Sequence, residues 1–226
     1  MIARICVSIL PKNNLEALSL IERAEKAQAN LIEVRLDCLE TSRNLSELVK
    51  STKIPLIATN KLLSEKGFFA GTETERQQTL LEVAKNGFEY VDVDVSSPKH
   101  KETIVKLKQL GTKPIVSYHK FDGALSVSEM EKVLEQEIAS GASACKIITT
   151  AKKIEDNLSV LNFVSAMSSK AKLVCFCMGE QGKISRLLSP MFGAFFTFAS
   201  LEQGSETAAG QMTVQEMKAT YDLLGA

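Results

Sequence analysis

A lysine inside one apolar run and a histidine at the end of the preceding run are the residues best suited to catalysis. Lys146 interrupts the small and apolar residues of 142–148, and His119 follows the run 113–118. Burial disfavours the charged form of a lysine and so favours the neutral amine that attacks a carbonyl carbon. With His119 as general acid and base, such an amine could act on the carbon next to a ketone. Alternatively, Lys146 reaches the rim or pairs with an acidic neighbour.

Alternating charges mark two further runs. Glu33, Arg35 and Asp37 are spaced by two residues, so a strand would place all three on one face. They could form ion pairs on a solvent-facing edge strand, or they could need partners or a polar ligand in a parallel sheet covered on both faces. Asp92 and Asp94 also share a face, where they could orient a neighbouring cation or only stabilise the interior.

Glycine-containing segments near the C-terminal end predict an anion site. Residues 178–186 end in Arg186, whose guanidinium suits a carboxylate or phosphate, although a helix start with a surface arginine has the same pattern. The polar segment 203–211 is long enough to form a lid, but loops of this composition are often only mobile. With His119 as the only plausible histidine ligand, no zinc-type ligand set is expected, and no Gly-x-Ser-x-Gly motif supports a serine hydrolase. The other histidine, His100, is flanked by lysines and is expected in solvent.

The elements that must position these residues alternate along the whole chain. Short apolar runs, each followed by an amphipathic stretch, predict parallel strands joined by helices. Eight such pairs favour a (β/α)8 barrel over an open doubly wound sheet, because no Gly-x-Gly-x-x-Gly turn follows the first strand. In a barrel the C-terminal ends of the strands carry the chemistry. The predicted strands are 4–10, 30–36, 54–59, 90–95, 113–118, 142–148, 172–177 and 194–198, and the predicted helices are 14–27, 45–49, 73–85, 98–110, 126–139, 152–167, 183–191 and 214–224.

Local signals support several helix ends. Pro98 suits a first helical turn, and Gly111 and Gly141 suit the positions just after two helices. Two capping boxes are predicted, Ser126 with Glu129 and Thr213 with Glu216. Because no linker or composition shift interrupts the chain, we expect a single catalytic domain over 1–226.

The composition limits the possible partners. The 226 residues include 27 basic and 27 acidic side chains, and this zero net charge argues against a broad nucleic-acid or membrane surface. Five cysteines, an odd number mostly within apolar runs, predict buried reduced thiols of a cytoplasmic protein. The start lacks the pattern of a signal peptide, and no apolar run approaches the ~18 residues of a spanning helix. We therefore expect a small-molecule partner, with no nucleic acid and no membrane.

Together these motifs resemble the type I 3-dehydroquinate dehydratases, across essentially the whole chain. The matching pieces are residues 33–37 and 117–121, Lys146 with Ile147, residues 178–186, and Gly210 with Gln211. The resemblance implies a (β/α)8 enzyme without metal or cofactor. Its substrate would be 3-dehydroquinate, which loses water to give 3-dehydroshikimate in the shikimate pathway, toward chorismate and the aromatic amino acids. A homodimer is compatible with the resemblance, but the residues do not determine the oligomeric state.

The resemblance also implies roles for individual residues. Lys146 would form an imine with the C3 ketone, and His119 would remove the C2 proton and later protonate the departing C1 hydroxyl. Glu65 falls where the family has an acidic partner for the histidine. The implied substrate-binding residues are Ser8 beside the substrate, Glu33 and Arg35 at the ring hydroxyls, Lys61 after the third strand, Arg186 and Gln211 at the carboxylate, and Thr207 in the lid.

The sequence departs from the family pattern in two places, and it leaves two other functions open. Lys61 stands where the family commonly has an arginine, so a point charge would replace a forked contact. The closing loop is longer than usual, so the lid hydroxyl could belong to Thr207 or Ser205, and the spacing to Gln211 favours Thr207. A Schiff-base aldolase would use the same lysine, and an idle barrel would only bind. A carboxylate site at Arg186 favours the dehydratase.

Overall fold

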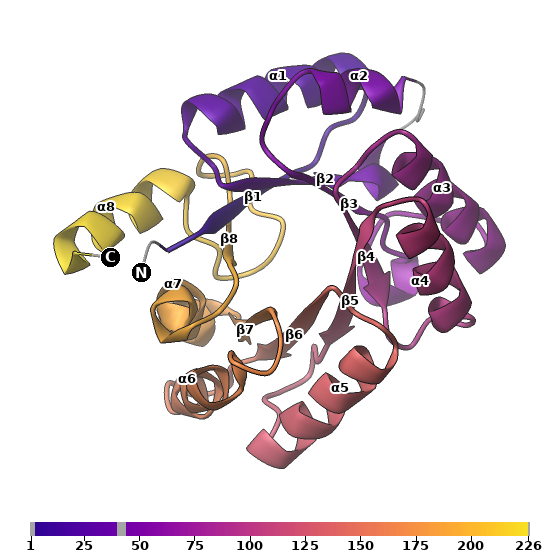
Figure 1. Ribbon diagram of the computed structural model, residues 1–226. Coiled ribbons are helices and arrows are strands. Elements are labelled where there is room, and N and C mark those ends of the chain that lie inside the picture. Colours follow the sequence, from indigo (N-terminus) through magenta and orange to yellow (C-terminus); the bar gives the residue numbers. More distant parts are fainter. Residues whose placement is uncertain (1–2, 40–43, 226) are drawn as a thin grey trace.

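The computed structural model describes residues 3–39 and 44–225, and its strands form a ring (Figure 1). All neighbouring strands are parallel, in the order β7-β6-β5-β4-β3-β2-β1-β8. The two ends of this sheet approach each other, and the Phe195 N–H donates a hydrogen bond of 2.7 Å to the Leu173 carbonyl. The expectation of a (β/α)8 barrel is therefore confirmed. The strands are β1 Ile5–Ile9, β2 Leu31–Arg35, β3 Leu56–Thr59, β4 Tyr90–Asp94, β5 Lys113–His119, β6 Ala144–Thr150, β7 Leu173–Met178 and β8 Thr197–Ala199.

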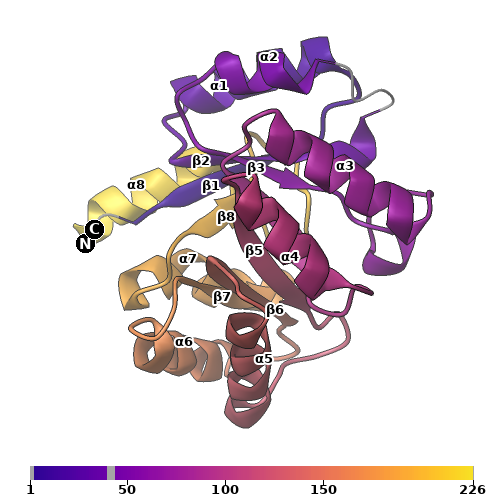
Figure 2. The ribbon, with the colours of Figure 1, turned by 45° about the vertical axis from the view of Figure 1, so that its right-hand side comes forward.

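Helices cover the outside of the ring (Figures 1 and 2). They are α1 Asn14–Lys26, α2 Leu45–Lys50, α3 Glu73–Lys85, α4 His100–Gln109, α5 Val127–Ala139, α6 Asp156–Met167, α7 Lys183–Leu188 and α8 Val214–Leu224, with short 3-10 turns η1 Leu36–Cys38, η2 Leu63–Glu65, η3 Glu180–Gly182 and η4 Ser189–Phe192. The bounds predicted for α3 and α8 are confirmed. Both predicted capping boxes are present, and Gly111 and Gly141 follow helix ends with φ of +84° and +88°.

Some boundaries differ from the prediction. Pro98 lies outside α4, because Lys99 adopts a left-handed conformation (φ +59°) before the helix begins at His100. Helix α6 begins at Asp156 rather than 152, since the Asp156 carboxylate accepts hydrogen bonds from the backbone N–H groups of Lys152 and Lys153. The expectation that His100 lies in solvent is wrong.

The His100 ring is partly buried between two helix ends. Its Nδ1 lies 2.9 Å from the Ser97 carbonyl oxygen, and its Nε2 lies 3.1 Å from Ser140 Oγ. The cysteine thiols are free, as expected. Four are buried and Cys38 is partly buried. Within the part of the chain that the structure describes, no helix is both long and apolar enough to cross a membrane.

Inward-facing strand residues form two layers inside the barrel. The lower layer is an apolar cluster that includes Cys6, Leu31, Ile57, Tyr90, Ile115, Ala144, Val174, Phe196 and Phe198. Two residues further along six of these strands the inward side chains are polar and buried: Ser8, Glu33, Thr59, Asp92, Ser117 and Lys146. The strand period of two places both layers on the same face. The apolar layer therefore supports a polar layer that points toward the C-terminal ends of the strands.

Candidate active site

A cavity of about 360 Å³ opens above this polar layer at the C-terminal ends of the strands. Nine of the ten residues predicted from the sequence line it: Glu33, Arg35, Lys61, Glu65, His119, Lys146, Arg186, Thr207 and Gln211. The tenth, Ser8, lies beneath it and donates a hydrogen bond to Glu33. The fold thus brings together side chains from β2, β5, β6 and α7 and from the segments after β3 and β8.

Lys146 projects from β6 between two carboxylates. Its Nζ lies 3.0 Å from Asp92 Oδ2 and 3.7 Å from Glu33 Oε1, and it also lies 4.6 Å from the centre of the Phe198 ring. Only 7% of the side chain is exposed. The sequence left open whether Lys146 reaches the rim or pairs with an acidic neighbour, and the structure shows that it pairs with Asp92 and Glu33. A proton must therefore leave this amine before it can attack a carbonyl carbon.

His119 lies at the end of β5, next to the strand that carries Lys146. Burial, followed by the nearby Lys61 ammonium, lowers the pKa of His119 to about 4, although Asp94 acts in the opposite direction. The imidazole is therefore neutral near pH 7 and can accept a proton. Its Nδ1 lies 4.0 Å from Asp94 Oδ2, and its ring stacks near Phe121, with 5.8 Å between centroids and 12° between planes.

Asp92 and Asp94 accept contacts from the cations around them. Burial alone would raise the pKa of Asp92, but the ammonium groups of Lys146 and Lys61 hold that pKa well below its usual range. Burial acts in the same way on Asp94, and the pKa of Asp94 is nevertheless lowered by His119, Lys61 and Ser96. Both side chains therefore remain carboxylates. Of the two roles that the sequence allowed, their contacts with Lys61 and Lys146 favour the one in which they orient neighbouring cations.

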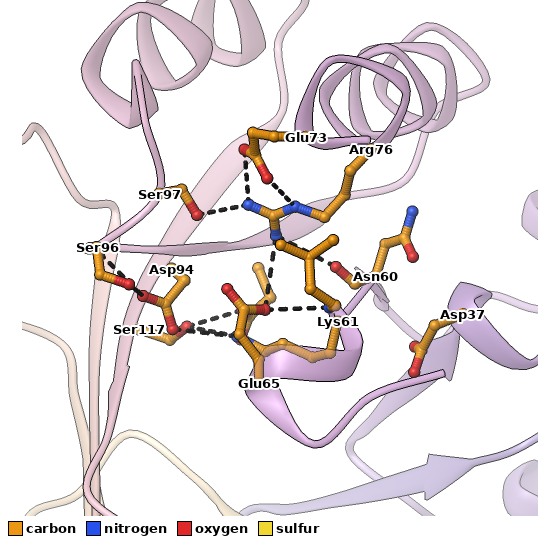
Figure 3. Close-up of polar contacts among 12 residues, drawn as sticks. Asp37, Asn60, Lys61, Glu65, Glu73, Arg76, Asp94, Ser96, Ser97 and Ser117 are labelled. Carbon is orange, nitrogen blue, oxygen red and sulfur yellow. Dashed lines mark hydrogen bonds and ion pairs between the residues drawn. The ribbon is translucent and has the colours of Figure 1, made fainter. Parts of the chain in front are cut away.

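Glu65 lines the same cavity, but its hydrogen bond and its ion pair are with residues other than His119 (Figure 3). Its carboxylate accepts a hydrogen bond of 3.3 Å from the Leu62 N–H and lies 3.9 Å from Arg76. Burial raises the pKa of Glu65 above its usual range. The carboxylate within 4.0 Å of the histidine ring is that of Asp94. A direct partnership of Glu65 with His119 therefore stays a prediction.

Arg76 was missed by the sequence reasoning. It lies on α3 with only 1% of its side chain exposed, and two of its nitrogens bind Glu73 at 2.7 and 2.8 Å. It also donates to the Asn60 carbonyl (3.2 Å) and to Ser97. Figure 3 shows how these contacts join α3 to the segment that carries Glu65. In the sequence, an arginine three residues after a glutamate is typical of an exposed helix pair, so no local signal distinguished it.

Glu33 and Arg35 occupy the β2 side of the cavity. Thr59 donates a hydrogen bond of 2.8 Å to Glu33. The Arg35 guanidinium forms a forked pair with Asp37, with contacts of 2.9 and 2.5 Å, and Asp37 also accepts from the Phe68 N–H at 3.0 Å. These charges are buried and paired, so the alternative of a solvent-facing edge strand is wrong.

Arg186 has no acidic partner among the described residues, unlike Arg35, Lys61 and Lys146. It is 1% exposed, its Nε lacks a hydrogen-bond acceptor, and its Nη2 donates only to the Ala209 carbonyl at 3.3 Å. The guanidinium also lies 4.4 Å from the centre of the Phe176 ring. Burial lowers the pKa of Arg186 to about 10, so it still carries its charge near pH 7. A buried unpaired guanidinium is well suited to an anionic ligand.

The segment 203–211 covers the side of the cavity next to Arg186. The Thr207 N–H donates to Gln211 Oε1 at 2.7 Å, and both residues line the cavity, whereas Ser205 Oγ donates to the Glu202 carbonyl. Gly210 has φ +74°, and a Cβ there would lie 2.2 Å from the Gly179 carbonyl oxygen. Only glycine allows this close approach. Thr207 lines the cavity and Ser205 does not, and the role of Thr207 as the lid hydroxyl stays a prediction.

The barrel and the polar cavity at its C-terminal rim define a (β/α)8-barrel enzyme. A model of the type I 3-dehydroquinase family matches residues 5–226. The chain belongs to this family and is an enzyme of the lyase class.

Named relatives support this membership. The chain is 36% identical to the 3-dehydroquinate dehydratase of Dehalococcoides mccartyi over 193 residues, which cover 85% of each protein. It is 32% identical to the enzyme of the same name from Methanococcus maripaludis over 222 residues, covering 97% of this chain and 99% of the relative.

Solved structures are similar as well. The type I 3-dehydroquinate dehydratase of Clostridium difficile superimposes with a TM-score of 0.90 at 25% identity, covering 98% of this chain and 92% of that one. The 3-dehydroquinate dehydratase of Aquifex aeolicus gives 0.82 at 26% identity, with coverages of 97% and 98%.

Proposed function

We propose that this enzyme dehydrates 3-dehydroquinate to 3-dehydroshikimate in the shikimate pathway through an imine on Lys146. The observation that carries the proposal is that Lys146, a neutral His119 and the unpaired Arg186 line one cavity. The first two supply a nucleophile and a base, and the third suits the substrate carboxylate. The proposed chemistry uses no metal or cofactor.

The reaction begins at the C3 ketone. Lys146 gives up a proton and its nitrogen attacks C3. A proton returned to the carbinolamine hydroxyl lets it leave as water, which gives a protonated imine. This cation withdraws electrons from C2, so His119 can remove a C2 proton and form an enamine. The enamine pushes out the C1 hydroxyl while His119 returns the proton, so the hydroxyl leaves as water. Water then attacks the iminium carbon, releasing 3-dehydroshikimate and the free amine.

The remaining predicted residues would hold the substrate in place. Arg186 and Gln211 suit the carboxylate, because both lie beside the segment that covers the cavity. Glu33 and Arg35 suit the ring hydroxyls on the opposite side. The predicted contacts of Ser8 and Thr207, and the predicted pairing of Glu65 with His119, belong to the same proposal. So do a cytoplasmic location and a homodimer, which sedimentation at several protein concentrations would test.

Borohydride trapping tests the imine directly. The enzyme is incubated with 3-dehydroquinate, treated with borohydride and digested, and the peptide masses are measured. An adduct is expected only on the peptide that contains Lys146. Lys146→Ala should give no adduct and no turnover. An adduct that persists on another lysine in this variant would show that the nucleophile is assigned wrongly.

His119→Ala separates the two catalytic roles. It should still form the trapped adduct, but turnover should fall by about 10² to 10⁴, the usual contribution of one acid/base group. Near-normal turnover would contradict the assignment. Product absorbance separates the rivals, because an aldolase would give an adduct without the enone and a binding protein would give neither.

A further inference from the structure

Lys61 contacts the polar layer rather than standing free in the cavity. Its Nζ lies 2.8 Å from Asp92 Oδ1, 3.1 Å from Ser117 Oγ and 3.7 Å from Asp94 Oδ2. Only 8% of the side chain is exposed. Two of these oxygens, Asp92 Oδ1 and Ser117 Oγ, lie within hydrogen-bond distance of the ammonium group, and Asp94 Oδ2 is close enough for an ion pair. Figure 3 shows the side chain reaching toward Ser117 and Asp94.

The same two aspartates contact the two residues proposed to do the chemistry. Asp92 uses its second oxygen, Oδ2, to bind Lys146 at 3.0 Å. Asp94 lies 4.0 Å from His119 through Oδ2, the oxygen that also faces Lys61. One carboxylate thus joins Lys61 to the amine, and another joins it to the imidazole.

We propose that Lys61 is a positioning residue that sets the charge of Lys146 and His119 through Asp92 and Asp94, and that it does not bind the substrate ring. This inference rests on the proposed function. It assigns Lys61 a role different from the substrate contact that the family resemblance implied. The reason is geometric, because its donors are directed to strand oxygens beneath the cavity.

The surrounding charges determine the expected direction of the effect. The charged or titratable groups that face Lys61 are Asp92 and Asp94 on β4, Glu65 in η2, His119 on β5 and Lys146 on β6, with Glu33 of β2 beyond Lys146 and Arg76 of α3 beyond Glu65. Without Lys61, the Lys146 ammonium would face Asp92 and Glu33 with no competing cation. The amine would then be held by carboxylates that no second cation shares.

Loss of Lys61 should affect the histidine in a measurable way. Burial is the main reason that the pKa of His119 is low, and the Lys61 ammonium is the next. Removing that ammonium while Asp94 remains should raise the pKa of His119. Because the reaction needs the neutral imidazole, the acid side of the pH profile of kcat/KM should move to higher pH.

Three substitutions test the role. Lys61→Met removes the charge and the hydrogen bonds, Lys61→Gln removes the charge but keeps a donor, and Lys61→Arg keeps the charge. For Met and Gln we expect the acid limb of kcat/KM to rise by about one pH unit, because a charge a few ångströms away usually shifts a pKa by one to three units. Adduct formation at pH 7 should slow about tenfold while KM changes less than about twofold. Lys61→Arg should keep the wild-type pH profile.

The outcomes separate this role from a substrate contact. An unchanged pH profile together with a KM raised about tenfold in Lys61→Met and Lys61→Gln would overturn the inference and restore a direct contact. If Lys61→Met does not fold, Lys61→Gln carries the same test, and NMR titration of the His119 ring measures the shift without turnover. A wild-type enzyme that gives no adduct would refute the proposed function instead, since the pKa shift of His119 would still be measurable.

Discussion

The two walls of the cavity differ in how their charges are paired. On the strand wall, Glu33, Arg35 and Lys61 line the cavity above Asp92 and Asp94, and each of these charges lies within 4.0 Å of an opposite one. On the lid wall, formed by Arg186, Thr207 and Gln211, the one cation has no acidic partner among the described residues. Pairing tunes protonation states, whereas an unpaired buried charge stabilises a bound ion of opposite sign. The strand wall thus suits the chemistry, and the lid wall suits recognition.

The largest expected effect on stability tests the paired wall. Asp92→Ala should lower the free energy of unfolding by about 3 to 5 kcal/mol, because Lys61 and Lys146 would lose the carboxylate that they share. Arg186→Met should leave that free energy unchanged or raise it, since this guanidinium has no acidic partner. Urea denaturation of both variants measures the difference, and equal losses would break the comparison.

Loss of Arg186, which should not lower the free energy of unfolding, should strongly weaken substrate binding. Arg186→Ala should raise KM by about 10- to 100-fold, the worth of a hydrogen-bonded charge, and should reduce kcat much less. Arg186→Lys is the matched control, because it keeps a point charge but loses the fork and should recover only part of the affinity. If KM is unaltered in Arg186→Ala, the carboxylate binds elsewhere.

An intermediate effect concerns stability against pH. The pKa of His119 in the folded protein, about 4, lies below the ordinary value of about 6.5. Between these values the unfolded chain binds a proton that the folded chain does not, so the free energy of unfolding should fall as the pH decreases from about 6.5 to about 4. His119→Gln should flatten this slope in urea titrations at pH 7, 5.5 and 4.5. Asp92 and Asp94 act only below about pH 4, because their pKa values are held below the usual range.

The smallest expected effect sharpens the description of the lid wall. Thr207→Val should raise KM about two- to tenfold, because one neutral hydrogen bond is lost. Ser205→Ala should change it little, since the Ser205 hydroxyl donates to the Glu202 carbonyl rather than lining the cavity. Steady-state kinetics of the two variants decides between them, and the reverse order would assign the lid hydroxyl to Ser205.

Much of the cavity could be predicted because strand periodicity is a local property. Residues two apart share a face, so the inward positions of Glu33, Asp92 and Lys146 follow once the strands are recognised. Boundaries were less reliable where a side chain binds the backbone before a helix, as the Asp156 carboxylate at the start of α6 illustrates.

Pairings between distant segments could not be predicted. The burial of Arg76, the proximity of Asp94 rather than Glu65 to the histidine, and the contacts of Lys61 all join elements far apart in the chain. Each depends on the stagger of neighbouring strands and on the reach of a side chain, and no sequence spacing encodes either of these.

The amino-acid order alone therefore specifies eight strand and helix units, the faces of their residues and the types of chemical group at the strand ends, since these follow from short-range periodicity. Which cation meets which carboxylate was settled only by the tertiary structure. Strand pairing places β4 between β3 and β5, and Asp92 lies within 3.0 Å of both Lys61 and Lys146. The physical reason is that Coulomb interactions depend on distances in space.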